Sequence, residues 1–214
     1  MSTSVAELHA KRPADGCPAD QAVALSVPPG VKLQVSAEDF WLLACENPDL
    51  RLERTAEGVL IVMAPASPDG SQRNLSLAAQ LWNWNRQAGI GIAFESSVGF
   101  TLPSSAVRGP DVSWIALDRW EKLSPEDRLK FSHICPDFVV ELRSKSDTVP
   151  DLHAKMEEYL AQGVRLGWLI DPFRGKAEIY RPGRPVEVLD RPATLSGEDV
   201  LPGFVLDLKG ILFD

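Results

Sequence analysis

Two acidic residues stand beside or inside apolar runs, where their chemistry suits a divalent cation. Asp111 follows Gly109-Pro110 and opens residues 112–116, a run typical of a strand. Glu141 lies inside the apolar run 138–142, and a carboxylate in an apolar strand is costly without a partner. Mg²⁺ binds oxygen ligands and often uses one or two carboxylates plus substrate phosphate. If the two strands are neighbours, the carboxylates of Asp111 and Glu141 can converge, and the pair predicts a binding site for Mg²⁺ (or Mn²⁺).

Lys155 is the third residue with this potential. The helix predicted over residues 149–161 has an apolar face that includes Leu152, Met156 and Tyr159, and Lys155 lies within that face. A lysine there can orient an attacking water or steady the charge of a phosphate. A bound metal lowers the pKa of its water and polarises a phosphoryl oxygen. Together with the two carboxylates, Lys155 therefore predicts phosphodiester hydrolysis.

Each of these residues also has a simpler interpretation. Asp111 could be a solvated loop residue or a turn cap, and Glu141 could form an ion pair with Arg143 two residues later. Lys155 could pack its stem on the helix face while its amine reaches water. These alternatives stay open until the fold places the three residues.

Other motifs carry less information. The three histidines are far apart and show no zinc spacing, and no phosphate-binding glycine loop is present. Several tryptophans could include one that stacks on a nucleobase, although core packing is the simpler interpretation. These are Trp82, Trp84, Trp114, Trp120 and Trp168.

The motifs resemble a known nuclease family. Pro110-Asp111 followed by Glu141-Leu142-Arg143 resembles the PD…(D/E)XK pattern. The run PDFVVELRSKSDTVPDLHAKMEEYLAQGVRLGWLIDP, with GFTLPSSAVRGPDVSWI before it and LPGFVLDL after it, is similar to the Uma family of bacterial restriction endonucleases. That family belongs to the PD-(D/E)XK nuclease superfamily, and the resemblance extends over residues 31–213.

The resemblance implies a fold, a reaction and roles. The fold would be α/β, a restriction-endonuclease-like mixed central sheet flanked by helices, with added β-hairpins. The activity would be metal-dependent endonuclease cleavage of DNA. Asp111 and Glu141 would bind the metal, Lys155 would be the catalytic lysine, and Glu53 in RLERTAEG would be an additional acidic ligand.

Two departures from the family pattern keep other functions open. Arg143 stands where the superfamily has lysine, and arginine can bind a phosphate in bidentate fashion but cannot act as a base. Many family members carry a histidine early in the first long helix, where this chain has residues 72–74, Gln-Arg-Asn. A catalytically inactive binding or regulatory module is therefore one alternative. A metal phosphoesterase acting on RNA or a small nucleotide is another.

The remaining elements predict a mixed sheet between helices. Residues 1–30 resemble a mobile tail, and the nuclease-like domain is expected over residues 31–214. Helices are expected from Ser36 to about residue 46, over 71–88 and over 149–161, with a charged, helical excursion at 118–131. Strands and hairpins are expected at 50–54 with 59–63, 90–95, 98–102, 112–116, 138–142 (central), 167–170, 177–181 with 186–189, and at an edge within 201–213.

Composition limits the setting. With 214 residues the chain suits one domain, and its net charge of −8 argues against a constitutive nucleic-acid coat but not against a nuclease that binds DNA through a cation. No run approaches the roughly 20 apolar residues of a membrane span, and no secretory signal is present. Three scattered cysteines predict free thiols in a reducing cytoplasm. DNA is the expected substrate, and a homodimer would suit cutting both strands.

Overall fold

The computed structural model describes residue 27 and residues 30–213. The chain divides into two units, Met1–Val31 and Lys32–Asp214, and nearly all described residues belong to the second. The tail predicted for residues 1–30 lies outside the described residues apart from residues 27 and 30.

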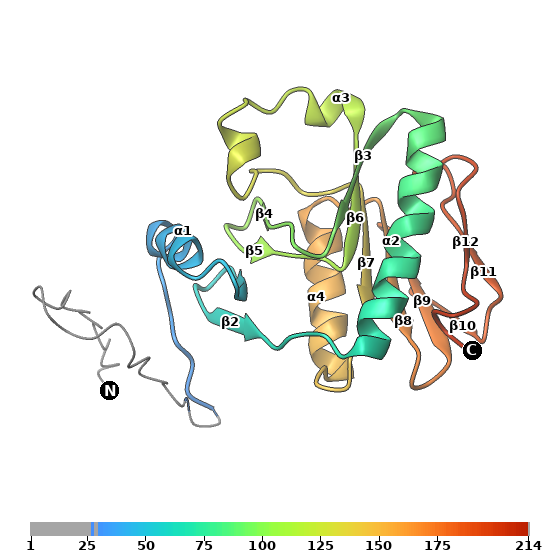
Figure 1. The fold of residues 1–214 in the computed structure, drawn as a ribbon, viewed down its shortest axis with the longest axis horizontal. Helices are drawn as coiled ribbons and strands as arrows, with labels where there is room; N and C mark the ends of the chain where they lie inside the picture. The colour runs from blue at the N-terminus through green and yellow to red at the C-terminus, as the bar shows by residue number, and fades with distance from the viewer. Residues whose placement is uncertain (1–26, 28–29, 214) are drawn as a thin grey trace, which may run out of the picture. The chain divides into compact units, whose positions relative to one another are not determined.

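A six-stranded mixed sheet forms the centre of the second unit (Figure 1). Its inner strand β7 runs antiparallel to β6 and parallel to β8. The prediction that residues 138–142 form a central strand is therefore confirmed. In spatial order the strands are β10 (Glu187–Asp190), β9 (Lys176–Tyr180), β8 (Leu166–Asp171), β7 (Phe138–Leu142), β6 (Val112–Ala116) and β3 (Gly91–Glu95).

The long helices α2 (Pro68–Ala88) and α4 (Val149–Gln162) pack on opposite faces of this sheet. The alternation of side chains along β6 and β7 sends one set of apolar residues to each helix. On the α2 face, Leu77 and Leu81 share a core cluster with Val112, Trp114, Phe138 and Val140. On the α4 face, Leu152, Met156 and Tyr159 share another with Ile115, Val139 and Leu169.

Local signals in the sequence set the ends of both helices. Thr148 caps α4 by accepting a hydrogen bond from the Asp151 N–H, and Gly163 ends it in the left-handed region at φ 114°. Helix α2 starts three residues earlier than predicted. Ser67 is its N-cap and Pro68 its first residue, a position that proline tolerates well.

A second, four-stranded sheet has the order β2-β1-β5-β4. The predicted hairpin is confirmed as β1 (Arg51–Arg54) and β2 (Leu60–Met63), paired antiparallel. The short strands β5 (Val107–Arg108) and β4 (Phe100–Thr101) complete the sheet. Helix α1 (Ala37–Glu46) precedes it and begins at Ser36, whose hydroxyl accepts from the Asp39 N–H as predicted. This sheet carries Glu53 and Arg108.

At the periphery one sequence prediction is wrong and another is confirmed. The excursion at residues 118–131 contains only the one-turn helix α3 (Leu117–Trp120) and a 3₁₀ turn at Asp127–Leu129. Pro125 interrupts it, because the residue before a proline avoids the helical region. The edge strand predicted within residues 201–213 is present as β12 (Val205–Asp207), which pairs with β11 (Thr194–Ser196) in a separate two-stranded sheet.

The C-terminal pair covers α2. Gln80 of α2 exchanges two hydrogen bonds with the backbone of Asp207, and Leu195 and Leu206 join the α2-side core. Within the described part of the chain, no helix has the length and apolar character needed to cross a membrane.

Candidate active site

Asp111 and Glu141 meet across the pairing of β6 with β7. The register pairs Val112 with Val140, and continuing it by one residue places Asp111 opposite Glu141 on the α4 face of the sheet. The Asp111 Oδ2 accepts a hydrogen bond of 2.8 Å from the Leu142 N–H, which ties Asp111 to the end of β7. Asp111 is therefore not a solvated loop residue.

Lys155 reaches this pair from α4. Its Nζ lies 2.9 Å from Glu141 Oε1 and 2.8 Å from Glu53 Oε1, with its side chain only 11% exposed. The alternative of an amine in water is thus wrong. The alternative of a Glu141–Arg143 ion pair is wrong as well, because Glu141 pairs with Lys155 and Arg143 pairs with Asp171.

Glu53 is held by three donors. Besides Lys155, the Gly109 N–H donates to its Oε1 over 3.0 Å, and Arg108 Nη1 lies 3.1 Å from its Oε2. Arg108 also donates from Nε to Glu158 on α4 over 2.6 Å. This chain of ion pairs links the small sheet to α4 and fixes the side of the site that faces β1.

The environment of Glu141 opposes its ionisation. Burial and the negative charges of Asp111 and Glu53 together raise the pKa of Glu141 to about 7, although the positive charge of Lys155 lowers it in part. Burial also raises the pKa of Asp111, although the Leu142 N–H and Lys155 lower it in part. Two buried carboxylates with raised pKa values form a place where an added positive charge would be favourable.

Lys155 and Glu53 stay charged. Burial alone would lower the pKa of Lys155, but the nearby carboxylates of Glu141 and Glu53 outweigh it and raise that pKa. Burial alone would raise the pKa of Glu53, but Lys155 and Arg108 outweigh it and lower that pKa. Lys155 is therefore an ammonium group that donates hydrogen bonds at neutral pH.

Arg143 lies just past β7 and is anchored away from Glu141. Its Nη1 lies 2.9 Å from Asp171 Oδ2, and its guanidinium sits over the Phe173 ring at 5.6 Å. The side chain is 21% exposed, and its Nε is buried with no hydrogen-bond partner among the described residues. Because Nε is buried, a further ligand of Arg143 would have to meet its two Nη groups, which carry four of the five N–H donors.

Sequence reasoning missed three contributors. The buried Tyr159 hydroxyl donates to Glu141 Oε1 over 3.0 Å, and Arg108 and Glu158 complete the ion-pair chain. For Tyr159 a signal was present, since it lies four residues after Lys155 on the same helix face. For Arg108 and Glu158 no local pattern exists, because their contacts depend on how β5 meets α4.

Comparison with known proteins places the chain in a family. The family model for Uma2, described as "Putative restriction endonuclease", matches residues 37–209. The chain belongs to this family. The resemblance seen in the sequence is thereby confirmed, and no curated protein matches the chain.

A solved structure supports the fold. It is titled as a "putative nuclease belonging to DUF820 from Anabaena variabilis ATCC 29413" and has a TM-score of 0.69 to this chain. The match covers 83% of this chain and 97% of that chain at 21% identity. At that identity the likeness shows a shared fold, which confirms the predicted restriction-endonuclease-like α/β class.

The residues of this site fit a divalent cation. No group of three or more His, Cys, Asp or Glu side chains within the described residues is arranged to hold a metal by itself. Mg²⁺, however, typically takes one or two carboxylates and fills its other positions with water and phosphate oxygens. Asp111 and Glu141 offer that pair, and burial raises the pKa of both carboxylates although Arg51 and Lys155 lie close to them.

Proposed function

We propose that this protein is a metal-dependent endonuclease that hydrolyses phosphodiester bonds of DNA. The observation that carries the proposal is the buried contact of 2.9 Å between Lys155 and Glu141, with Asp111 opposite Glu141 across β6 and β7. A carboxylate pair that can hold a metal ion, beside a buried ammonium group, is a set of charges suited to metal-assisted phosphodiester hydrolysis. Membership of the Uma2 family supports the same reaction.

Asp111 and Glu141 are the proposed ligands of Mg²⁺ (or Mn²⁺). When bound, the ion would supply a water of lowered pKa and polarise a phosphoryl oxygen. The Leu142 N–H fixes the Asp111 carboxylate, and the Tyr159 hydroxyl fixes that of Glu141. Both ligands are thus oriented before any ion arrives.

Lys155 would act as a hydrogen-bond donor and a positive charge. Because its pKa is raised, it cannot serve as the base, so its task is to orient the attacking water and steady the phosphate. Glu53, which is itself paired with Arg108, holds the ammonium in place from the β1 side. Glu53 as an additional metal ligand stays a prediction, because three donors already occupy its carboxylate and leave one lone pair on Oε2 for an ion.

Two further parts of the proposal concern the DNA. Arg143 would contact a phosphate through the part of its guanidinium that Asp171 does not occupy. A homodimer would present two sites to the two strands of a duplex in the cytoplasm. Sedimentation of the protein with and without duplex DNA tests that arrangement.

Supercoiled plasmid nicking tests the function. Wild-type protein is expected to nick the plasmid with Mg²⁺ or Mn²⁺ and not with EDTA, and Asp111→Asn, Glu141→Gln and Lys155→Met are each expected to lose at least 100-fold in rate. Asp118→Asn is the matched control, because Asp118 is an exposed acidic residue that pairs with Lys122. Circular dichroism establishes that every variant is folded.

Either result is informative. Nicking that persists in Asp111→Asn would remove Asp111 from the site. A folded wild-type protein that neither nicks DNA nor binds Mg²⁺ in calorimetry would point to the inactive binding or regulatory module. Cleavage of RNA or a small nucleotide in place of DNA would point to the phosphoesterase.

A further inference from the structure

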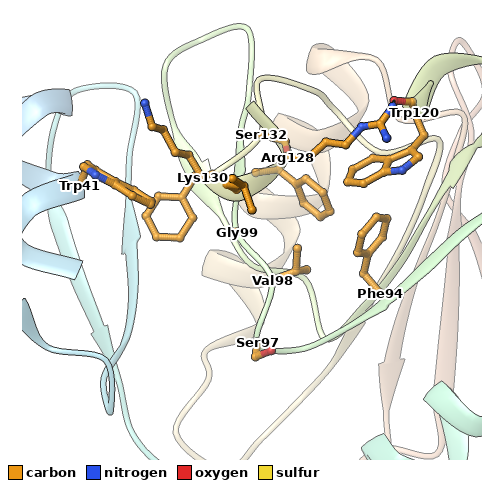
Figure 2. Close-up of a pocket in the computed structure, with 12 residues that line it drawn as sticks. Trp41, Phe94, Ser97, Val98, Gly99, Trp120, Arg128, Lys130 and Ser132 are labelled. Carbon is orange, nitrogen blue, oxygen red and sulfur yellow. The ribbon is translucent and has the colours of Figure 1, made fainter. Parts of the chain in front are cut away.

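A cavity of about 290 Å³ lies beside the proposed catalytic site and has walls of aromatic rings. Figure 2 shows Trp41 of α1 at one end and Phe94 and Trp120 at the other, with Val98 and Gly99 between them. These three aromatic residues are only partly buried, although large aromatic side chains of a monomer usually bury most of their surface. The Arg128 guanidinium lies over the Trp120 ring and Phe94 packs against it, so a ligand reaches the Trp120 face only by taking the place of Arg128.

The rings are held in place by one another and by a glycine. Phe131 packs edge-on against Trp41, with centroids 5.3 Å apart, and Phe94 packs against Trp120 at 5.3 Å. A Cβ at Gly99 would lie 2.4 Å from the Phe131 ring, so this ring can lie on the backbone only because residue 99 is glycine. The two aromatic pairs form a preformed site with flat walls.

The charges around the cavity suit an anionic ligand. The chain carries a net charge of −8. Of the described residues that line this cavity, however, two are charged and both are basic, Arg128 and Lys130. The Arg128 guanidinium lies 5.0 Å from the centre of the Trp120 ring and donates to the Trp120 carbonyl, which fixes it at the rim. Flat aromatic walls with a basic rim match a base joined to a phosphate.

The cavity continues toward the catalytic residues. A second cavity of about 140 Å³ is lined by Arg51, Glu53 and Gly109, which lie at the proposed site. Both cavities share Ser97, Val98, Gly99 and Phe131 in their linings. A strand lying along these shared residues would therefore pass from the aromatic rings to Glu53, the carboxylate that pairs with Lys155.

We propose that the aromatic cavity receives an unpaired nucleobase of the strand that is cut. This inference rests on the proposed nuclease function and narrows its substrate. Bases inside a duplex are stacked and cannot enter such a cavity, so the strand must be single or the base must be turned out of the helix. The base takes the place of the Arg128 guanidinium on the Trp120 ring, and Arg128 and Lys130 turn from the Trp120 carbonyl and from Glu126 to the neighbouring phosphates.

Binding of two oligonucleotides that differ only in their bases tests this assignment. The ligands are a fluorescein-labelled thymidine hexanucleotide and a hexamer of abasic sites with the same phosphates, titrated by anisotropy with Ca²⁺, while gels verify that the strands stay intact. Trp120→Ala is expected to weaken thymidine binding about tenfold, the size of one base–aromatic stack, and to leave abasic binding unchanged. Trp120→Phe is expected to restore most of the loss.

Matched variants keep the test decisive. Trp82→Ala is the control, because Trp82 is a 51% exposed tryptophan on α2 that does not line the cavity. Trp41→Ala and Arg128→Gln replace Trp120→Ala if loss of the Trp120–Phe94 contact unfolds the protein. Both variants are expected to weaken thymidine binding severalfold, and Trp82→Ala is expected to change it less than twofold.

The outcomes separate this inference from the nuclease function. Equal binding of both hexamers, or thymidine binding unchanged in folded cavity variants, overturns the base site even if Asp111-dependent nicking persists. If thymidine binding depends on Trp120 but neither the wild type nor any variant nicks DNA, the base site is supported and the nuclease function is overturned. Thymidine monophosphate that binds as tightly as the hexamer, with the same Trp120 dependence, overturns the strand as ligand in favour of a free nucleotide.

Discussion

At the scale of single residues, the ionisation of Glu141 depends on its neighbours more than on its own chemistry. Its carboxylate is buried, faces Asp111 and is hydrogen-bonded by Tyr159 and Lys155. A pKa near 7 leaves part of the Glu141 population protonated at neutral pH. Metal binding and proton release are therefore coupled at this residue.

Glu141 should make the free energy of unfolding fall as pH rises. Its pKa is about 7 in the folded protein and near 4.5 in the unfolded chain, so the folded state binds more protons between these values. Relative to Glu141→Gln, the wild-type free energy of unfolding should decrease by on the order of 1–3 kcal/mol between pH 5 and pH 8. Urea denaturation of both proteins across that range measures the difference.

The same experiment contains its own check. Mg²⁺ added at pH 8 should recover stability in the wild type and not in Glu141→Gln, because the ion compensates the buried charge. A difference between the two proteins that stays constant from pH 5 to pH 8 would show that Glu141 titrates like an exposed carboxylate.

What the sequence revealed about the site depended on local pattern. Asp111, Glu141 and Lys155 interrupt apolar strands or an apolar helix face, so the pattern itself marks them. Glu53 has no such mark and was found only through the family resemblance. Its contact with Lys155 joins residues 102 positions apart, and only the packing of the small sheet against α4 creates it.

At the scale of elements, Lys155 is positioned by the packing of α4 on β8. A Cβ at Gly167 in β8 would lie 2.6 Å from the Met156 Cε, so the end of the Met156 side chain occupies the space that the missing Cβ leaves under α4. Met156 adjoins Lys155 in the sequence and is fully buried. The height of α4 above the sheet thus sets how far Lys155 reaches toward Glu141.

Gly167→Ala should therefore destabilise the protein by about 1–3 kcal/mol, the usual cost of adding a methyl group to a filled core. Met156→Leu removes the terminal methyl that the new Cβ would meet. The double variant should be less destabilised than the sum of the single variants, as measured by urea denaturation in a double-mutant cycle. Additive effects would mean that α4 moves as a whole and that the Met156 methyl is not the obstacle.

Elements with a strong apolar period were predictable, and those shaped by distant contacts were not. Strands β6 and β7 and helix α4 were predicted within about one residue, because burial dictates their composition. Strand β5 has two residues and exists only because β1 and β4 pair with it. The loop after α3 was predicted to be helical from its charges, yet its shape follows from packing of Phe131 against α1.

At the scale of the whole molecule, the net charge of −8 opposes binding of any polyanion. The buried carboxylates of Asp111, Glu141 and Glu53 place part of that charge where the proposed phosphate would lie. A divalent cation would reverse the local sign, and the basic residues of the aromatic cavity would add to it. Affinity for DNA should therefore depend on the cation far more than in a basic DNA-binding protein.

Neutralising the two proposed metal ligands should raise the affinity for a nucleic-acid strand without a cation, as the cation itself would, but should not permit cleavage. The double variant Asp111→Asn/Glu141→Gln is expected to bind the single-stranded hexanucleotide in EDTA at least fivefold more tightly than the wild type, because it removes two negative charges facing the phosphate. Ca²⁺ should tighten binding by the wild type and not by the variant, and neither should cut in EDTA. Anisotropy titrations at low and moderate salt measure these affinities, with Asp118→Asn as the charge control. Tight binding of the wild type in EDTA, unchanged in the double variant, would show that the strand lies away from Asp111 and Glu141.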